Sequence, residues 1–434
     1  AADVSSAGVS NITVFTPAPG GGQSSPQAFT TSAPLSFSPQ ARVSAGSATS
    51  CALSAAGVAR CWGNSVSGGV GDGQLGVRLT PSPVSGGFQF RGIMTQSSQS
   101  CGVTIGNALI CWGRYTTSAL TPSNSATPLQ IATPEPVLAF STSFDSFLCI
   151  LSVSKAVWCR ALLNTSGQLG TGNTNLSDGN FARVTGNHAF EAIAIGRSHA
   201  CALKADGQTW CWGAGDLVGR AGAPNTSPTP APIDGAHQFV RLTAATNHTC
   251  ALTPSGEAWC WGSPLNSVLG APGGFDRLPV RVSGNHRFVS ISAGTSHTCA
   301  VDTQGAAWCW GSGVLGRTGR PDESTGTTPL RIEAAGVAFT EISAGGEHTC
   351  AMDNTNATWC WGSEEFGKLG NGVLSWLDAP APIAGTSGFV DIDATGAVCG
   401  IELLNANEQL IAGDDGKVVF VNQLDGARSE LKVA

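Results

Sequence analysis

The sequence predicts an all-β fold, a β-propeller built from repeated four-stranded units. Fourteen of its 15 cysteines form pairs ten residues apart, and the pairs recur every 48 to 52 residues. Each unit holds short apolar segments separated by turn residues, and no segment shows a helical period over about 12 residues or more. A period near 50 residues is typical of propellers, solenoids or arrays. Radial repetition of four-stranded sheets leaves few exposed sheet edges, which favours the propeller.

One unit shows the elements in order. Residues 288–311 read FVSISAGTSHTCAVDTQGAAWCWG. Alternating apolar residues from Phe288 predict a first strand, the segment around Cys299 a second, and the Trp-Cys-Trp-Gly segment after a polar turn a third. A Pro-containing stretch such as 278–282 supplies the fourth. Side chains alternate along a strand, so Trp308 and Trp310 share one face and are expected to pack between neighbouring units.

Seven full units begin near residues 40, 90, 138, 190, 239, 288 and 339. A degenerate eighth begins at Phe389 and lacks the second cysteine and the tryptophans; its expected strands are 390–393, 399–403, 409–412 and 418–422. We therefore predict an N-terminal extended arm at 1–32, a propeller of seven repeats at 33–388, and residues 389–434 closing the ring or packing beside it. A ring of eight blades is the alternative.

The cysteine spacing favours disulfides. Folding 299–309 as a hairpin places Cys299 opposite Cys309, and facing residues of antiparallel strands lie roughly 4.5–5.5 Å apart, within the range that a disulfide spans. Reduced cysteines in a β-core are the alternative, whereas a zinc site would need closely spaced pairs that are absent. The predicted bridges are Cys51–Cys61, Cys101–Cys111, Cys149–Cys159, Cys201–Cys211, Cys250–Cys260, Cys299–Cys309 and Cys350–Cys360. Cys399 has no partner and is expected to be a buried free thiol rather than an intermolecular link.

The composition excludes several functions. The net charge is −7 and charged residues make up 12%, which disfavours binding to nucleic acid. The sequence has no apolar run of about 18 residues, the length that a membrane span would need. No GxSxG, HExxH or P-loop motif is present, so we expect no enzyme activity, no cofactor and no metal.

Seven disulfides would imply an oxidising compartment, so a secreted or cell-surface location is expected. The chain opens with AADVSS, which has neither the basic nor the apolar region of a signal peptide and is compatible with the product of cleavage. If the source glycosylates its secreted proteins, the candidate acceptors are Asn11, Asn164, Asn175, Asn225, Asn247 and Asn356.

The unit resembles the repeat of the regulator-of-chromosome-condensation propellers. The shared residues are Ala293-Gly294, His297-Thr298, Trp310-Gly311 and Leu315-Gly316, with Gln74-Leu75-Gly76, Gln168-Leu169-Gly170 and Lys368-Leu369-Gly370 in other units. The resemblance covers about residues 40–400 and implies a propeller, usually of seven blades, that members of the family use for unrelated functions. The paired cysteines are most similar to the extracellular members, the Crinkly-type ectodomains.

Few residues stand out as sites. Histidines that recur in consecutive units, such as His297 and His348, are expected to be architectural, with turn-stabilising hydrogen bonds. Trp376 lies in a loop outside the repeat and is a candidate partner anchor. In the arm, Ile12, Val14 and Phe15 are candidate assembly anchors, because an extended strand can add to a sheet of a neighbour.

Two functions follow. The first is a non-enzymatic secreted structural or adhesive propeller whose arm joins copies into an extracellular fibre or surface layer. The second is a monomeric extracellular binding module, a receptor ectodomain or inhibitor-like propeller, that recognises a protein or glycan through loops such as 114–136, 213–232 and 363–380.

Overall fold

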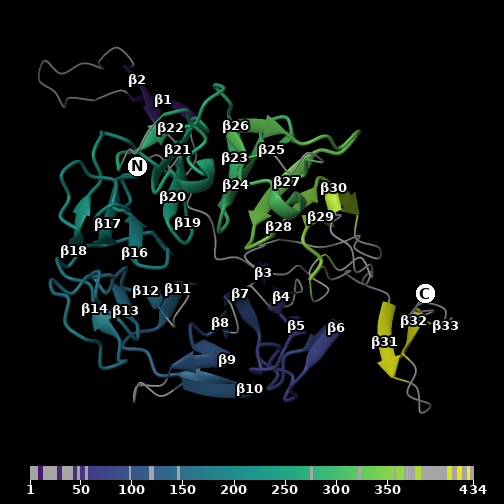
Figure 1. The fold of residues 1–434 in the computed structure, drawn as a ribbon. Coiled ribbons are helices and arrows are strands. Elements are labelled where there is room, and N and C mark those ends of the chain that lie inside the picture. Colours follow the sequence, from purple (N-terminus) through teal and green to yellow (C-terminus); the bar gives the residue numbers. More distant parts are fainter. Residues whose placement is uncertain are drawn as a thin grey trace, which may run out of the picture.

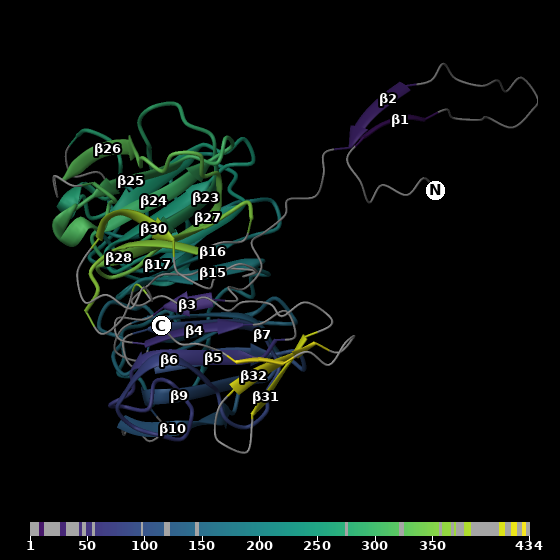
Figure 2. The same cartoon turned by 90° about the vertical axis from the view of Figure 1, so that its right-hand side faces the viewer.

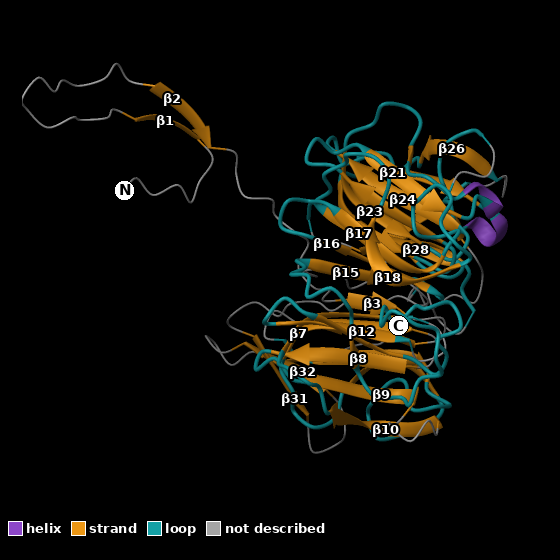
Figure 3. Ribbon diagram, turned by 90° about the vertical axis from the view of Figure 1, so that its left-hand side faces the viewer, coloured by secondary structure: helices purple, strands orange, loops and turns teal. Residues whose placement is uncertain are grey.

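The computed structural model is a β-propeller of seven blades. It describes residues 8–12, 27–31, 43–45, 49–53, 57–96, 99–116, 122–143, 147–273, 277–320, 325–355, 358–365, 369, 377–382, 408–412, 418–422 and 428–430. Seven sheets of four antiparallel strands follow one another around a ring (Figure 1). Strands dominate the described residues, with two short 3-10 turns as the helical elements there (Figure 3). The predicted fold class and blade number are confirmed.

Each blade takes its four strands from one repeat. Blade one holds β3 (Val43–Ala45), β4 (Thr49–Leu53), β5 (Ala59–Asn64) and β6 (Val77–Pro83). Blade two holds β7 (Phe90–Gln96), β8 (Gln99–Thr104), β9 (Leu109–Thr116) and β10 (Pro122–Ile131). Blade three holds β11 (Val137–Thr142), β12 (Leu148–Ser152), β13 (Val157–Arg160) and β14 (Ala182–Arg183). Blades four and five hold β15 (Ala192–Ile195), β16 (His199–Leu203), β17 (Thr209–Ala214), β18 (Thr226–Pro232); β19 (Arg241–Ala244), β20 (His248–Leu252), β21 (Ala258–Gly262), β22 (Val280–Arg281). Blades six and seven hold β23 (Phe288–Ala293), β24 (His297–Asp302), β25 (Ala307–Gly311), β26 (Gly326–Arg331); β27 (Phe339–Ala344), β28 (His348–Asp353), β29 (Thr358–Gly362), β30 (Leu377–Pro382).

The strands of a blade lie side by side in sequence order, from the inside of the ring outward. The first strands of consecutive blades, from β3 and β7 to β23 and β27, pack against one another. Fourth strands such as β6, β10, β14 and β18 lie at the outside (Figure 1). Because neighbouring strands run antiparallel, two kinds of connection meet at one end of every blade: the turn between its first and second strands and the loop between its third and fourth. We call this end the loop face, and the opposite end, with the hairpin turns between second and third strands, the hairpin face.

The hairpin of blade six shows why the repeat folds locally. Cys299 faces Cys309 in the register of β24 and β25, and Val301 faces Ala307. The Asp302 carboxylate closes the turn by accepting hydrogen bonds from the backbone N–H groups of Gln304 and Ala306 at 2.9 Å. Gly305 has a φ of +80°, a conformation that glycine adopts at no steric cost. The turn residues therefore fix the register that places the two cysteines opposite each other.

The hydrophobic core lies between blades. One cluster joins Cys250, Leu252 and Cys260 of blade five to Phe288 and Trp310 of blade six, and these five side chains are at most 3% exposed. Trp308 packs against the same cluster and is partly exposed. The prediction that both tryptophans face the neighbouring unit is confirmed.

Two small sheets share no strand with a blade. β1 (Gly8–Ile12) pairs with β2 (Gln27–Thr31), and this hairpin lies away from the ring (Figure 2). β31 (Glu408–Ala412), β32 (Val418–Asn422) and β33 (Arg428–Glu430) form a three-stranded sheet. Strands β31 and β32 match the expected 409–412 and 418–422, whereas 390–393 and 399–403 lie outside the described residues. No helix in the described residues is long and apolar enough to cross a membrane.

Candidate functional site

A disulfide joins the two middle strands of every blade. In all seven pairs the sequence separation is 10 and the Cα atoms lie 4.0–4.2 Å apart. Every one of these cysteines is at most 1% exposed. The predicted pairing is confirmed. The bridged cysteines are Cys51, Cys61, Cys101, Cys111, Cys149, Cys159, Cys201, Cys211, Cys250, Cys260, Cys299, Cys309, Cys350 and Cys360.

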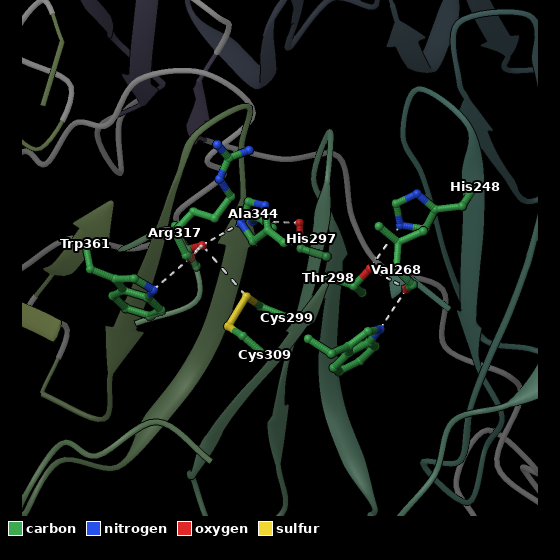
Figure 4. Close-up of a disulfide and its surroundings, with 12 residues drawn as sticks. His248, Val268, His297, Thr298, Cys299, Cys309, Arg317, Ala344 and Trp361 are labelled. Carbon is green, nitrogen blue, oxygen red and sulfur yellow. Dashed lines mark hydrogen bonds between the residues drawn. A yellow bond between two sulfur atoms is a disulfide. The ribbon is translucent and has the colours of Figure 1, made fainter. Parts of the chain in front are cut away.

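Hydrogen bonds join blade five to blade six and blade six to blade seven in the same way. The indole N–H of Trp310 donates to the carbonyl oxygen of Val268 at 2.7 Å, and the Thr298 hydroxyl donates to the same oxygen at 3.0 Å. The Thr349 hydroxyl and Trp361 make the same pair of bonds to the carbonyl oxygen of Arg317, at 2.7 and 3.1 Å (Figure 4). These buried polar groups are therefore satisfied by the neighbouring blade, which fixes how consecutive blades sit.

The glycine motif of the loop between third and fourth strands accommodates these tryptophans. In blade three, Leu169 is 4% exposed, and a Cβ on Gly170 would lie 2.8 Å from Nε1 of Trp212. In blade one, the glycine beneath Trp112 is Gly71, and Leu75 is 63% exposed.

The assignment of Gln74-Leu75-Gly76 to this motif is therefore wrong, because the motif position falls at 69–71. In blade six the glycine against Trp361 is Gly319, three residues after the assigned Leu315-Gly316. Only contact with the tryptophan of the next blade distinguishes the correct glycine from its neighbours.

Buried histidines link blades four to seven. Nε2 of His199 lies 2.8 Å from Oγ1 of Thr249, and the corresponding distances are 2.9 Å for His248–Thr298 and 2.7 Å for His297–Thr349. We call these three contacts the histidine latches. The rings are 0–1% exposed. The histidines are architectural, as expected, but their side chains bind the next blade rather than a turn of their own.

Burial sets the charge of these rings. Desolvation lowers the pKa of His199 to about 4, and that of His248 and His297 to about 3. Neighbouring positive charge adds to this for His297, beside Arg317 and His248. The histidines are therefore neutral at physiological pH.

A second set of histidines stacks on the partly exposed tryptophans. The ring centroids of His188 and Trp210 lie 4.2 Å apart, and those of His286 and Trp308 lie 3.9 Å apart. The Lys204 ammonium also lies over the Trp210 ring, at 3.9 Å. The tryptophan faces that meet these histidine and lysine side chains are therefore occupied within the chain itself.

The turns between first and second strands converge at the loop face. They surround a small hollow at the end of the central channel, lined by Ala245, Thr246, Gly294, Thr295 and Gly345 among others. Small residues are required here, because a Cβ on Gly294 would lie 2.5 Å from the carbonyl oxygen of Gly345. In the described residues, no group of three or more His, Cys, Asp or Glu side chains could hold a metal ion.

The candidate acceptor asparagines differ in exposure. Asn164 is 1% exposed, and its side-chain amide donates to the carbonyl oxygen of Asn173 at 3.0 Å. Asn175, Asn225 and Asn247 are exposed in loop-face connections of blades three, four and five.

Several expected residues cannot be placed in a site. Asn11 and Ile12 belong to β1, which pairs with β2 of its own arm. The residues that lie outside the described part of the chain are Val14, Phe15, Asn356, Trp376 and Cys399. Of the expected partner loops, 213–232 is described throughout: residues 215–225 form the loop-face connection, and the rest belongs to the end of β17 and to β18.

Comparison with known proteins identifies the repeat. Models of the regulator of chromosome condensation (RCC1) repeat match residues 190–217, 288–317 and 339–368, and also 255–301 and 304–352. A 90-residue segment, 20% of this chain, is 33% identical to human E3 ubiquitin-protein ligase HERC2, of which it covers 2%. The chain contains RCC1 repeats and folds as an RCC1-like propeller.

Solved structures are similar in fold. Human WBSCR16 has a TM-score of 0.69 at 17% identity, covering 79% of this chain and 98% of its own. Prp20p from Saccharomyces cerevisiae has a TM-score of 0.69 at 18% identity, covering 86% and 94%. The Crinkly WD40 ectodomain of the Arabidopsis thaliana receptor kinase ACR4 has a TM-score of 0.46 at 19% identity, covering 80% and 97%.

Proposed function

We propose that this chain is a non-enzymatic, protein-binding propeller of an oxidising compartment, secreted or held at a cell surface, and that its partner binds the loop face. The observation that carries the proposal is the contrast between a repeated interior and a varied loop face. The disulfides recur in every blade, and the tryptophans that pack between blades recur in most of them; both are buried. Residues that recur in this way hold the scaffold together, so recognition falls to the side chains that differ between blades.

The loop face carries such side chains. The turns of blades four to seven share one backbone hydrogen bond, and two residues before the histidine they carry Arg197, Thr246, Thr295 and Gly346 in turn. Arg197 and Thr295 are exposed. The loops between third and fourth strands add exposed apolar side chains, which favour a protein partner. Their exposed fractions are 67% for Val66, 63% for Leu75, 52% for Leu163, 78% for Leu176, 64% for Leu265 and 48% for Val314.

The oxidising compartment is supported by the disulfides, which persist outside the reducing cytosol. Protein binding has a precedent on this scaffold, since the structure of Prp20p is described together with its binding to Gsp1p and histones. The identity of the partner does not carry over, because the similarity to Prp20p is at the level of fold.

The test compares two double variants by co-purification from the source organism after proximity labelling. Leu265→Asp with Val314→Asp places charge on the loop face, and the matched control, Ile105→Asp with Val153→Asp, alters residues that are 65% and 50% exposed on the hairpin face. We expect the loop-face variant to lose a partner that the control and the unaltered protein retain. Loss with the control alone would move the site to the hairpin face, and no stable partner for any form would overturn the proposal.

Self-assembly through the arm is the second candidate. In the described residues, β1 and β2 pair only with each other, so each has an edge that could take a further strand. Electron microscopy and mass in solution, with and without residues 1–32, test this. Filaments from the intact chain and monomers from the truncated one would support a fibre or surface layer; monomers from both would exclude it.

A further inference from the structure

The histidine latches occupy one part of the ring only. His199, His248 and His297 begin the second strands of blades four, five and six, and each reaches the next blade. The same position holds Gln99 in blade two and Phe147, just before β12, in blade three. The three interfaces that join blades four, five, six and seven therefore each contain a histidine at a position where blades two and three have none.

Hydrogen bonding fixes the proton on two of the latches, those of His248 and His297. The Thr298 and Thr349 hydroxyls use their single proton to donate to the carbonyl oxygens of Val268 and Arg317. Nε2 of His248 and of His297 must therefore be the donor to the threonine oxygen, and Nδ1 carries the lone pair. A second proton would have to bind at Nδ1.

The packing around Nδ1 opposes a second proton. Nδ1 of His199 and of His297 is buried and has no hydrogen-bond partner among the described residues. A Cβ on Gly196 would lie 2.6 Å from Nδ1 of His199, and one on Gly294 would lie 2.9 Å from Nδ1 of His297, so the backbone packs directly against these atoms. An imidazolium here would be a buried charge whose new N–H finds no acceptor.

The charged side chains on the surrounding elements do not offset this cost. Around His199 and His248 they are Arg197, Lys204, Asp216, Arg241 and Asp302, and around His297 they are Asp302, Arg317, Glu341, Glu347 and Asp353, with His348 beside Thr349. Asp302 and Asp353 lie at the far ends of β24 and β28, where they accept hydrogen bonds from Trp308 and Trp359. Among these groups, Arg317 and the neighbouring histidines lower the pKa of the latch rings further.

We propose that the histidine latches are an acid-sensitive device. As pH falls, the three interfaces that join blades four, five, six and seven open before the interface between blades two and three. Buried neutral histidines oppose protonation in the folded ring, whereas the unfolded chain takes up protons freely below about pH 6.5. Stability is therefore fully present above that pH and is lost as pH falls toward the folded pKa values of about 3 to 4. At pH 5, each latch lowers the ratio of folded to unfolded chain by about 30-fold relative to a group that does not titrate.

The first test measures urea unfolding between pH 7 and pH 4 on the full chain. The test variant carries His199→Gln, His248→Gln and His297→Gln, since blade two already uses Gln99 at this position and glutamine keeps a donor. The matched control carries His188→Gln, His237→Gln and His286→Gln, which removes three partly exposed histidines outside the latches. We expect the unaltered protein and the control to lose stability steeply below pH 6.5 and the latch variant to lose much less. Equal pH dependence in all three would overturn the proposal.

The second test uses the unaltered protein and so does not depend on the variant folding. Amide hydrogen exchange, corrected for the intrinsic pH dependence of exchange, is compared at pH 7 and pH 5. We expect protection to fall in β16, β20 and β24 while β8 and β12 keep theirs. A uniform fall around the ring, or none in β16, β20 and β24, would contradict the proposal.

Discussion

Trp310 donates its indole N–H to the carbonyl oxygen of Val268 at 2.7 Å, and the two residues belong to different blades. The Trp310 ring is fully buried against the disulfide of the preceding blade. A side chain from the end of one repeat is thus held by the loop of the repeat before it. In blade six the Trp-Cys-Trp segment therefore has two roles: its cysteine bridges the two middle strands, and its second tryptophan joins that blade to its neighbour.

Replacing Trp310 by phenylalanine tests this contact. Trp310→Phe removes the donor and part of the buried ring, and we expect the free energy of unfolding to fall by about 2–4 kcal/mol. Trp308→Phe is the control, because Trp308 is partly exposed and bonds Asp302 of its own blade. Urea unfolding measures both, and an equal loss would show that Trp310 has no special role between blades.

Glycine at the channel end is required by close packing. Gly294→Ala would place a Cβ 2.5 Å from the carbonyl oxygen of Gly345 and 2.8 Å from Cε1 of His297, so we expect a loss of about 2 kcal/mol or more. Gly346→Ala, one position further along the same turn of the next blade, is the control, since its Cβ would meet only Thr295 Oγ1, at 3.9 Å. Thermal unfolding should separate the two variants, and a tolerated Gly294→Ala would refute the packing argument.

The buried disulfides should resist reduction in the folded protein. Every bridged cysteine is at most 1% exposed, so a small thiol cannot reach the sulfur atoms without opening a blade. We expect free thiols from these pairs to be released by dithiothreitol only in denaturant, as counted by alkylation and mass spectrometry. Rapid release under native conditions would mean that the blades open readily.

Removing one bridge should weaken the ring without abolishing its register. For the double variant Cys299→Ala with Cys309→Ala, we expect a loss of about 2–4 kcal/mol in urea unfolding. The hairpin should persist, because Asp302 still closes its turn. An unfolded double variant would show that the bridge, rather than the turn, sets the register.

A serine hydroxyl caps the inner edge of the next blade. Ser292 accepts a hydrogen bond from the backbone N–H of Ala344 at 2.9 Å, and both residues are buried. Ser292→Ala leaves that N–H unpaired, so we expect a loss of about 1–3 kcal/mol and faster amide exchange at Ala344. Thr295→Ala, at an exposed neighbouring position, should change stability by about 0.5 kcal/mol or less.

The repeat and its hairpins could be read from the sequence because they are local. Cys299 and Cys309 are joined by a short turn whose polar residues fix the register, so ten residues of sequence suffice to place them face to face. Motifs that depend on a neighbouring blade were harder to assign. The residues around Leu75 match the sequence of the motif, yet Leu75 is 63% exposed, because the glycine that packs against Trp112 is Gly71.

By itself, the sequence determined the all-β class, the four-stranded repeat and the disulfide pairing, since each depends on periodicity or on contacts within one hairpin, whereas the choice of seven blades over eight came from the structure. Tertiary structure alone decided the partners of the buried side chains: His297 with Thr349, 52 residues apart, and Trp310 with Val268, 42 residues apart. The physical reason is that these polar groups find partners only once two blades pack and exclude water, and no local pattern encodes which atoms then meet.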